Sequence, residues 1–168
     1  TIEQVKKGAR LIRHRRMLCE HLTAGLKDIP GITVPKIRKG CTHDYLLYVL
    51  LYDAKKMGMP RSEFIRRLDA EGIKCTVNDK RHVPPISGFV RPIHLQPVFQ
   101  KKKFRPGGYP WAFTERGRKM SYAKGLCPVV EDLWENRLLA INTIYPPLTK
   151  KDIDDIIHAF RKVATLSK

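Results

Sequence analysis

The stretch from Val83 to Glu131 constrains the fold most, because its proline and glycine content excludes long helices and strands. Its sequence is VPPISGFVRPIHLQPVFQKKKFRPGGYPWAFTERGRKMSYAKGLCPVVE. The same stretch is rich in aromatic residues, which a flexible linker rarely contains. We therefore expect an ordered, loop-rich region over 83–131 that packs on a core and contacts a ligand or partner.

The part of the chain before this stretch alternates helical and strand patterns. Apolar residues at steps of three and four over 2–29 predict one long helix, which Pro30 and Gly31 end. A second helix is expected between Pro60, which suits a first turn, and Gly72, which suits the position past the end. Apolar runs over 32–37, 45–52 and 73–77 predict strands, the second of them buried on both faces.

The part after the central stretch contains the clearest single element. Residues 129–136 predict a short helix and residues 138–144 a strand. Thr149 and Asp152 have the spacing of a capping box, so a helix over 149–166 is expected to begin there. An apolar period then continues from Ile153 to Val163. This order of elements predicts an α/β or α+β fold.

Size and charge limit the choice of partners. The 168 residues fit one domain, and 33 Lys and Arg against 16 Asp and Glu give a net charge of +17. Such an excess suits nucleic acid, an anionic membrane, a phosphate-bearing ligand or an acidic protein surface. Because the basic residues are spread through predicted helices and loops, we favour a partner surface or a solvated face over a dedicated nucleic-acid groove.

Targeting signals and cysteine pairs are missing from the sequence. No apolar run reaches membrane-spanning length, and no signal-peptide pattern opens the chain. The four cysteines are far apart and form no CxxC pair, so free thiols in a reducing, cytoplasmic setting are expected. The chain begins at Thr1 inside an amphipathic pattern, which suggests a piece of a larger protein.

Familiar catalytic and metal-binding motifs are also missing. The sequence contains no P-loop, GxGxxG or GxSxG pattern, and His43 and His94 have no recognised zinc spacing, so no metal site is expected. A cysteine–histidine nucleophilic pair stays open, since such residues meet only in the fold. His94 and Glu131 each lie beside proline, and a lone histidine or glutamate in a loop is more often a structural hydrogen-bond partner than a catalyst.

The basic residues of the central stretch alternate with aromatic rings. Cations can hold phosphates while rings stack on bases or sugars, so a basic polyanion- or RNA-binding module is one hypothesis. The competing interpretation is that the rings pack on the core while the cations are solvated. The basic residues concerned are Lys101, Lys102, Lys103, Arg105, Arg116, Arg118 and Lys119.

Taken in order, the segments resemble the C-terminal small domain of the DegT/DnrJ/StrS-type sugar aminotransferases, and the resemblance covers nearly the whole chain. Each motif is short, but their order and spacing are specific. The segments that carry the resemblance are HRRMLCEHLTAGLKDIPGITVP, THDYLLYVLLYD, PRSEFIRRLDAEGIKC, RPIHLQPVFQ, YAKGLCPVVEDLWENRLL and PPLTKKDIDDIIHAFRKV.

This resemblance implies a fold and an activity. It implies the small domain of a fold-type I enzyme that depends on pyridoxal phosphate, with a small antiparallel or mixed sheet and helices packed on it. The reaction would move an amino group from an amino-acid donor to a keto-sugar, often nucleotide-linked, or to a cyclitol. In this family a separate large domain holds the cofactor and its Schiff-base lysine, and the enzyme is a homodimer. The resemblance therefore implies that this chain alone is inactive, and it gives Lys124 no such role.

The resemblance also implies which residues contact the substrate. Residues 1–29 would form the helix that leaves the large domain, and 83–131 would form one wall of the substrate pocket. Within that wall His94 and Gln96 are the first candidates for substrate contacts, and His43 and Tyr109 are further candidates from their loop positions. No catalytic residue is assigned. Residues 101–119 are longer and more basic than expected of the family, which suits either a nucleotide sugar or an acidic large domain.

Overall fold

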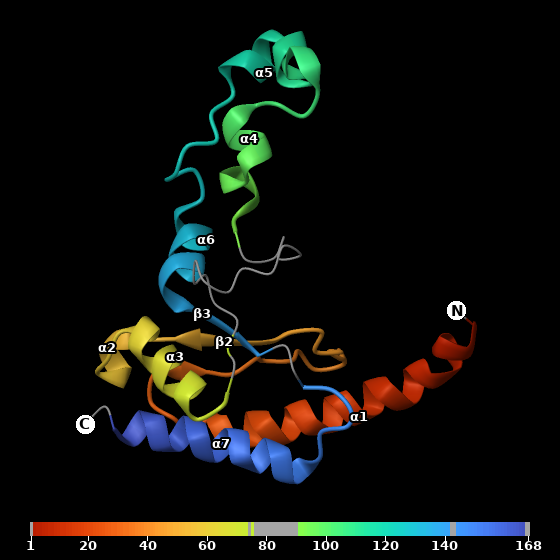
Figure 1. Ribbon diagram of the computed structural model, residues 1–168, viewed down its shortest axis with the longest axis vertical. Helices are drawn as coiled ribbons and strands as arrows, with labels where there is room; N and C mark the ends of the chain where they lie inside the picture. The colour runs from red at the N-terminus through yellow and green to blue at the C-terminus, as the bar shows by residue number, and fades with distance from the viewer. Residues whose placement is uncertain (1, 74, 76–90, 142–143, 167–168) are drawn as a thin grey trace. The chain divides into compact units, whose positions relative to one another are not determined.

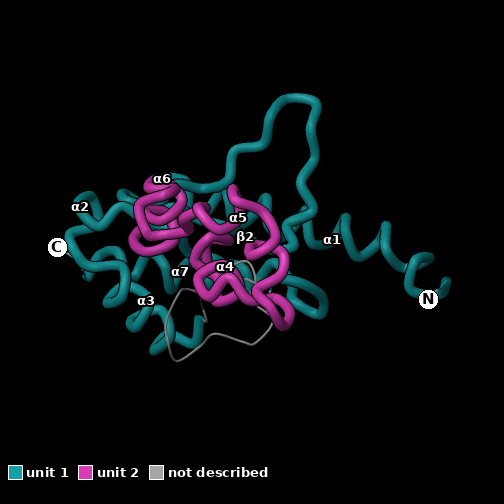
Figure 2. Tube along the Cα trace, turned by 90° about the horizontal axis from the view of Figure 1, so that it is seen from above, with its two compact units in different colours: residues 1–77, 137–168 teal, residues 78–136 magenta. Residues whose placement is uncertain are grey.

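A computed structural model describes residues 2–73, 75, 91–141 and 144–166 of the chain. The chain divides into two compact units, one made of 1–77 with 137–168 and the other of 78–136 (Figure 2). We refer to them as the first and the second unit and describe each by itself. The expectation of one domain over 1–168 stays a prediction.

The first unit is a small sheet covered by helices. Its strands β1 (Ile32–Thr33), β2 (Tyr48–Tyr52) and β3 (Leu138–Ile141) form an antiparallel sheet in the order β1-β2-β3. The helices are α1 (Ile2–Leu26), α2 (Ala54–Met57), α3 (Arg61–Ala70) and α7 (Lys150–Thr165). Figure 1 shows α1 and α7 side by side against one face of the sheet.

The core of this unit lies between the helices and the sheet. Tyr48, Leu50 and Tyr52 of β2 are buried, while the alternate residues Val49 and Leu51 are only half-buried. The expected burial of β2 on both faces is thus complete on one face only. Residues from the helices that are fully buried against this face include Leu18, Leu22, Leu26, Phe64, Ile153 and Phe160.

Helix α7 begins as its sequence predicts. The Thr149 backbone N–H donates to Oδ2 of Asp152 at 2.6 Å, which satisfies a helix-terminal donor and confirms the capping box. These hydrogen bonds from the hydroxyl and backbone of Thr149 lower the pKa of Asp152. The buried stripe of the helix is Ile153, Ile156, Ile157, Ala159, Phe160 and Val163.

The strands are shorter than predicted, and local backbone chemistry explains why. Strand β1 ends at Thr33 rather than 37, and Pro35 could not have continued the ladder because it has no N–H. Strand β2 begins at Tyr48 rather than 45, because Tyr45 adopts a left-handed conformation with φ of 48°. Strand β3 ends at Ile141, and residues 142–143 lie outside the described residues. The strand expected over 73–77 lies mostly outside them too, and neither Ile73 nor Cys75 is in a strand.

The second unit consists of short helices rather than long loops. Proline begins three of them, because its fixed φ suits a first helical turn and its missing N–H costs nothing there. The expected loop character is therefore only partly correct, and residues 83–90 lie outside the description. The elements are η1 (Ile93–Leu95), α4 (Pro97–Lys101), η2 (Pro106–Gly108), η3 (Trp111–Phe113), α5 (Glu115–Lys119) and α6 (Pro128–Asp132), followed by η4 (Leu133–Arg137).

Three aromatic rings give the second unit a core of its own. Trp111 Nε1 donates to the hydroxyl of Tyr122 at 2.9 Å, and the ring of Phe99 lies 5.2 Å from that of Tyr122. By contrast, Phe104 and Phe113 are exposed. Among the helices described, none combines the length and apolar character that a membrane span requires.

Candidate functional site

The second unit contains a buried hydrogen-bonded pair, His94 and Glu131. Their side chains are only 8% and 6% exposed, and His94 Nε2 lies 2.8 Å from Oε1 of Glu131. His94 lies in η1, and Glu131 lies in α6, 37 residues further along the chain. Charged side chains are rarely buried unless they are paired, so this contact accounts for both of them.

The carboxylate of Glu131 is held by the backbone as well as by His94. The Gly125 N–H donates to Oε2 at 2.8 Å, and the Cys127 N–H donates to Oε1 at 3.1 Å. Burial alone would raise the pKa of Glu131, but the hydrogen bonds from Gly125, Cys127 and His94 together lower it. Glu131 is therefore ionised at neutral pH.

The backbone on the His94 side is fixed by Gln100. Its Nε2 donates to the carbonyl oxygens of His94 and Tyr122, at 2.6 Å each. This bond ties the end of η1 to the aromatic core of the unit. Because Pro92 precedes η1 and Pro97 begins α4, the chain on both sides of His94 is also conformationally restricted.

Gln96 and Tyr109, the other predicted site residues of this unit, lie in separate surroundings. Gln96 is half-buried, and its Nε2 donates to the Arg91 carbonyl oxygen at 3.3 Å. Tyr109 is 47% exposed and packs edge-on against the ring of Phe113 at 5.4 Å. The structure thus places Gln96 two residues from the hydrogen-bonded pair and gives Tyr109 no described contact with it.

His43 belongs to the first unit. It is exposed, and its Nδ1 accepts a hydrogen bond from the Tyr45 backbone N–H at 2.9 Å. The ring also lies edge-on to Tyr45, with centroids 4.5 Å apart. These local contacts orient His43 beside a residue whose φ is positive.

The His94–Glu131 contact is the feature that sequence reasoning missed. From sequence alone, each of the two is interpreted as a separate hydrogen-bonding group beside proline. The sequence offers one weak signal for this pairing, which is that each residue lies in a segment whose backbone is restricted by a nearby proline. Their pairing depends on a fold that brings together positions 37 residues apart.

The described residues do not by themselves fit pyridoxal phosphate. A Schiff base needs a lysine whose amino group is shielded from solvent, and every described lysine is exposed or half-buried. Lys124 is exposed, and its Nζ contacts Oε1 of Glu135 at 2.5 Å, a hydrogen bond that raises the pKa of Lys124. No cluster of metal-ligating side chains occurs among the residues that the structure describes. We therefore derive no step through the cofactor on this chain.

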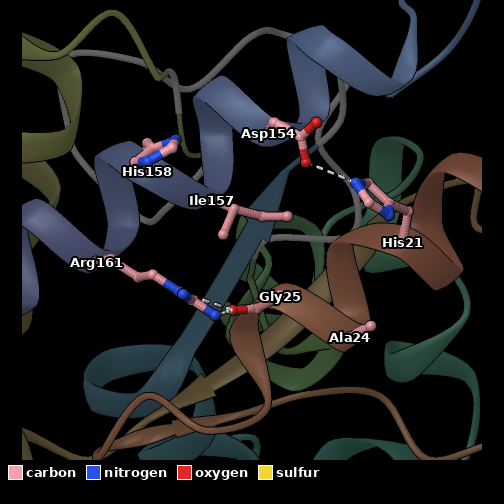
Figure 3. A pocket seen from close by; sticks show the side chains of 7 residues that line it. All are labelled: His21, Ala24, Gly25, Asp154, Ile157, His158 and Arg161. Carbon is pink, nitrogen blue, oxygen red and sulfur yellow. Dashed lines mark hydrogen bonds and ion pairs between the residues drawn. The ribbon is translucent and has the colours of Figure 1, made fainter.

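A shallow hollow of about 500 Å³ lies between α1 and α7 in the first unit (Figure 3). Several of its polar groups pair with one another: His21 Nε2 contacts Oδ1 of Asp154 at 2.6 Å, and Arg161 Nη2 donates to the Gly25 carbonyl oxygen at 3.0 Å. None of the predicted site residues lines it. The lining residues are His21, Ala24, Gly25, Asp154, Ile157, His158 and Arg161.

Comparison with known proteins identifies the family. A sequence model of the DegT/DnrJ/EryC1/StrS aminotransferase family matches residues 1–161. The chain belongs to this family. The expected family relationship and α/β fold class, with helices packed on a small antiparallel sheet, are thus confirmed.

Individual relatives are distant but extend along the whole chain. The chain is 26% identical over 163 residues to the spore coat polysaccharide biosynthesis protein SpsC of Bacillus subtilis. This alignment covers 96% of the chain and 34% of SpsC. A family aminotransferase from Brucella abortus aligns with a TM-score of 0.64 at 22% identity, over 96% of this chain and 33% of that one. DesV of S. venezuelae, solved in complex with a ketimine intermediate, aligns with a TM-score of 0.66 at 19% identity. That alignment covers 95% of this chain and 33% of the DesV chain. The chain therefore spans about a third of the length of its relatives.

Proposed function

We propose that this chain is the C-terminal small domain of a pyridoxal-phosphate-dependent aminotransferase. The enzyme would move an amino group from an amino-acid donor to a keto-sugar, probably nucleotide-linked, or to a cyclitol. The observation that carries the proposal is the family match over residues 1–161. The nucleotide-linked acceptor is supported by the relative DesI, solved with its TDP-sugar product, which aligns with 96% of this chain at a TM-score of 0.62.

In this proposal the partner of the chain is the large domain of the same polypeptide, and the enzyme is a cytoplasmic homodimer. Pyridoxal phosphate, held mainly by the large domain, supplies the electron sink for amino transfer. The exposed or half-buried state of the described lysines supports the assignment of the Schiff-base lysine to that domain.

The contribution of this chain would be one wall of the sugar pocket. His94 and Gln96 would contact the sugar, because they lie two residues apart on a segment fixed by Gln100 and Glu131. A fixed segment suits this role, since a pre-positioned polar group loses little entropy when the ligand binds. His43 and Tyr109 remain further candidates, both exposed.

The alternative function, a basic polyanion- or RNA-binding module, receives less support. Several cations of the central stretch are engaged within their own unit. Lys102 Nζ donates to the Arg118 carbonyl oxygen at 2.9 Å, and Lys119 pairs with Glu115 at 2.5 Å. Engaged cations can still attract phosphates, but a groove that tracks a nucleic-acid backbone needs a continuous row of available ones.

Absorbance spectra with pyridoxal phosphate test the proposal. The 168-residue chain and the longer polypeptide that the proposal implies would each be titrated with the cofactor. We expect the band of a lysine-bound cofactor from the longer polypeptide only, and one lysine substitution outside this chain should abolish it. A band from the 168-residue chain that disappears when one of its own lysines is replaced would refute the domain assignment.

A separate assay addresses the alternative. If the chain were an RNA-binding module, the longer polypeptide would bind RNA tightly, and replacing Lys101, Lys102 and Lys103 with Gln would weaken binding and reduce its salt dependence. Retention on an anionic column would not discriminate, because the net charge of +17 alone produces it.

A further inference from the structure

We propose that Glu131 is a positioning residue that holds the His94 ring in the tautomer protonated at Nε2, so that Nδ1 accepts a hydrogen bond from a hydroxyl group of the sugar. The inference rests on the proposed function for the identity of the ligand. The tautomer itself follows from contacts within the second unit and can be tested without any ligand.

The tautomer follows from the charge of Glu131. Its carboxylate is ionised and can only accept hydrogen bonds, so the His94 nitrogen 2.8 Å from it must carry the proton. In a neutral imidazole the other nitrogen then has a free lone pair. Among the described residues Nδ1 of His94 has no hydrogen-bond partner, so in the neutral ring its lone pair is left for a ligand.

Both members of the His94–Glu131 pair are anchored, which lets Glu131 set the direction of the ring. The Glu131 carboxylate is fixed by the N–H groups of Gly125 and Cys127 as well as by its place in α6. On the other side, Gln100 fixes the backbone of His94. A second residue that orients a histidine through one ring nitrogen commonly determines what the opposite nitrogen can do.

This arrangement determines which kind of ligand group can hydrogen-bond to Nδ1 of His94. An unprotonated Nδ1 can accept from an O–H or N–H donor, but it cannot donate to a phosphate oxygen. The ligand group facing His94 would therefore be a hydroxyl of the sugar ring rather than the diphosphate of a nucleotide sugar. The basic residues of 101–119 carry positive charge that could attract the phosphate instead.

Nitrogen NMR of the full-length polypeptide labelled with [15N]histidine tests the tautomer directly, with the His94 signals assigned from H94Q. At a pH at which the ring is neutral, we expect wild-type His94 to carry its proton at Nε2. In E131Q a mixture of the two tautomers is expected, because a glutamine side chain can both donate and accept. The matched control is E135Q, since Glu135 pairs with Lys124, and it should leave the His94 signals unchanged. E131D, in which the carboxylate is withdrawn by one methylene, replaces E131Q if the latter does not fold.

Binding of a TDP-linked amino sugar supplies the second readout. E131Q should weaken its affinity about tenfold through the misdirected ring, and E135Q should not. A wild-type ring protonated at Nδ1, or a tautomer and affinity both unchanged in E131Q, would overturn the inference. If wild-type protein binds no TDP-sugar, the proposed substrate class fails, while the NMR result still decides whether Glu131 sets the tautomer.

Discussion

Gly25 of α1 lies directly against Ile157 of α7. A Cβ built on Gly25 would be 2.3 Å from Cδ1, 2.6 Å from Cγ1 and 2.9 Å from Cγ2 of Ile157. Three atoms of one branched side chain are involved, so a rotation of its tip cannot relieve the overlap. The glycine therefore sets how closely the two helices approach.

Replacing this glycine should separate the helices. We expect G25A to lower the free energy of unfolding by about 1–3 kcal/mol, because overpacking outweighs the better helix propensity of alanine. The matched control is G8A in the same helix, where no atom lies within 4 Å of the added Cβ. That change should raise stability by about 0.5–1 kcal/mol. Urea unfolding measures both, and equal effects of the two substitutions would contradict the close packing at Gly25.

Phe160 tests the core of the first unit. It is fully buried and lies edge-on to Phe64, with ring centroids 5.8 Å apart. F160A should cost about 3–5 kcal/mol of stability, because it removes buried apolar area and leaves a cavity. F113A serves as the control, since Phe113 is 69% exposed and its loss should change stability by about 0.5 kcal/mol or less. A cost below about 1 kcal/mol for F160A would contradict the described core.

The cysteines should differ sharply in reactivity. Burial raises the pKa of the Cys19 thiol to about 12, whereas Cys41 is exposed. Because the thiolate is the reactive form, alkylation at pH 8 should modify Cys41 first and Cys19 on the order of 100-fold more slowly. Mass spectrometry of peptides at successive times measures the two rates. Unfolding in guanidinium should make them similar, and rapid native labelling of Cys19 would show that α1 does not pack as described.

Glu63 should make stability depend on acid pH. Hydrogen bonds from Arg66 and Arg67 lower its pKa from 4.5 to about 2. Because the folded value lies below the unfolded one, the carboxylate stabilises the fold above pH 4.5, and this contribution is lost as pH falls toward 2. E63Q should therefore flatten this part of the curve of unfolding free energy against pH. Parallel curves for the two proteins would show that the arginines do not stabilise the charged form of Glu63.

The elements that sequence predicts well are those with local causes. Helix α7 follows from its apolar period and from a capping box whose two residues are three positions apart, and helix α1 follows from its period. The end of β1 before Pro35 could also have been anticipated, since the missing N–H is a local property. By contrast, the late start of β2 depends on the positive φ of Tyr45, a conformation unusual for tyrosine that no sequence pattern indicates.

The candidate site shows the same division. A family resemblance in the surrounding segment predicts His94 and Gln96 as site residues, and this assignment stays a prediction. The surroundings of His94 could not be predicted in this way. Its partner is Glu131 in α6, and only the folded chain brings His94 Nε2 and Glu131 Oε1 to 2.8 Å. The aromatic residues could not be sorted from composition. Phe99, Trp111 and Tyr122 pack together in a small core. Phe104 and Phe113 are exposed, and composition does not distinguish these two groups.

The central claim is that this chain provides the sugar-binding wall of an aminotransferase. Its most direct test is the rate at which the full-length polypeptide converts glutamate to 2-oxoglutarate with a TDP-linked keto-sugar as acceptor, for wild type and H94A. We expect turnover in the wild type, a KM for the keto-sugar raised about tenfold or more in H94A, and an unchanged KM for glutamate. Turnover with equal sugar KM in both proteins, or no transfer to any keto-sugar or cyclitol, would contradict the account.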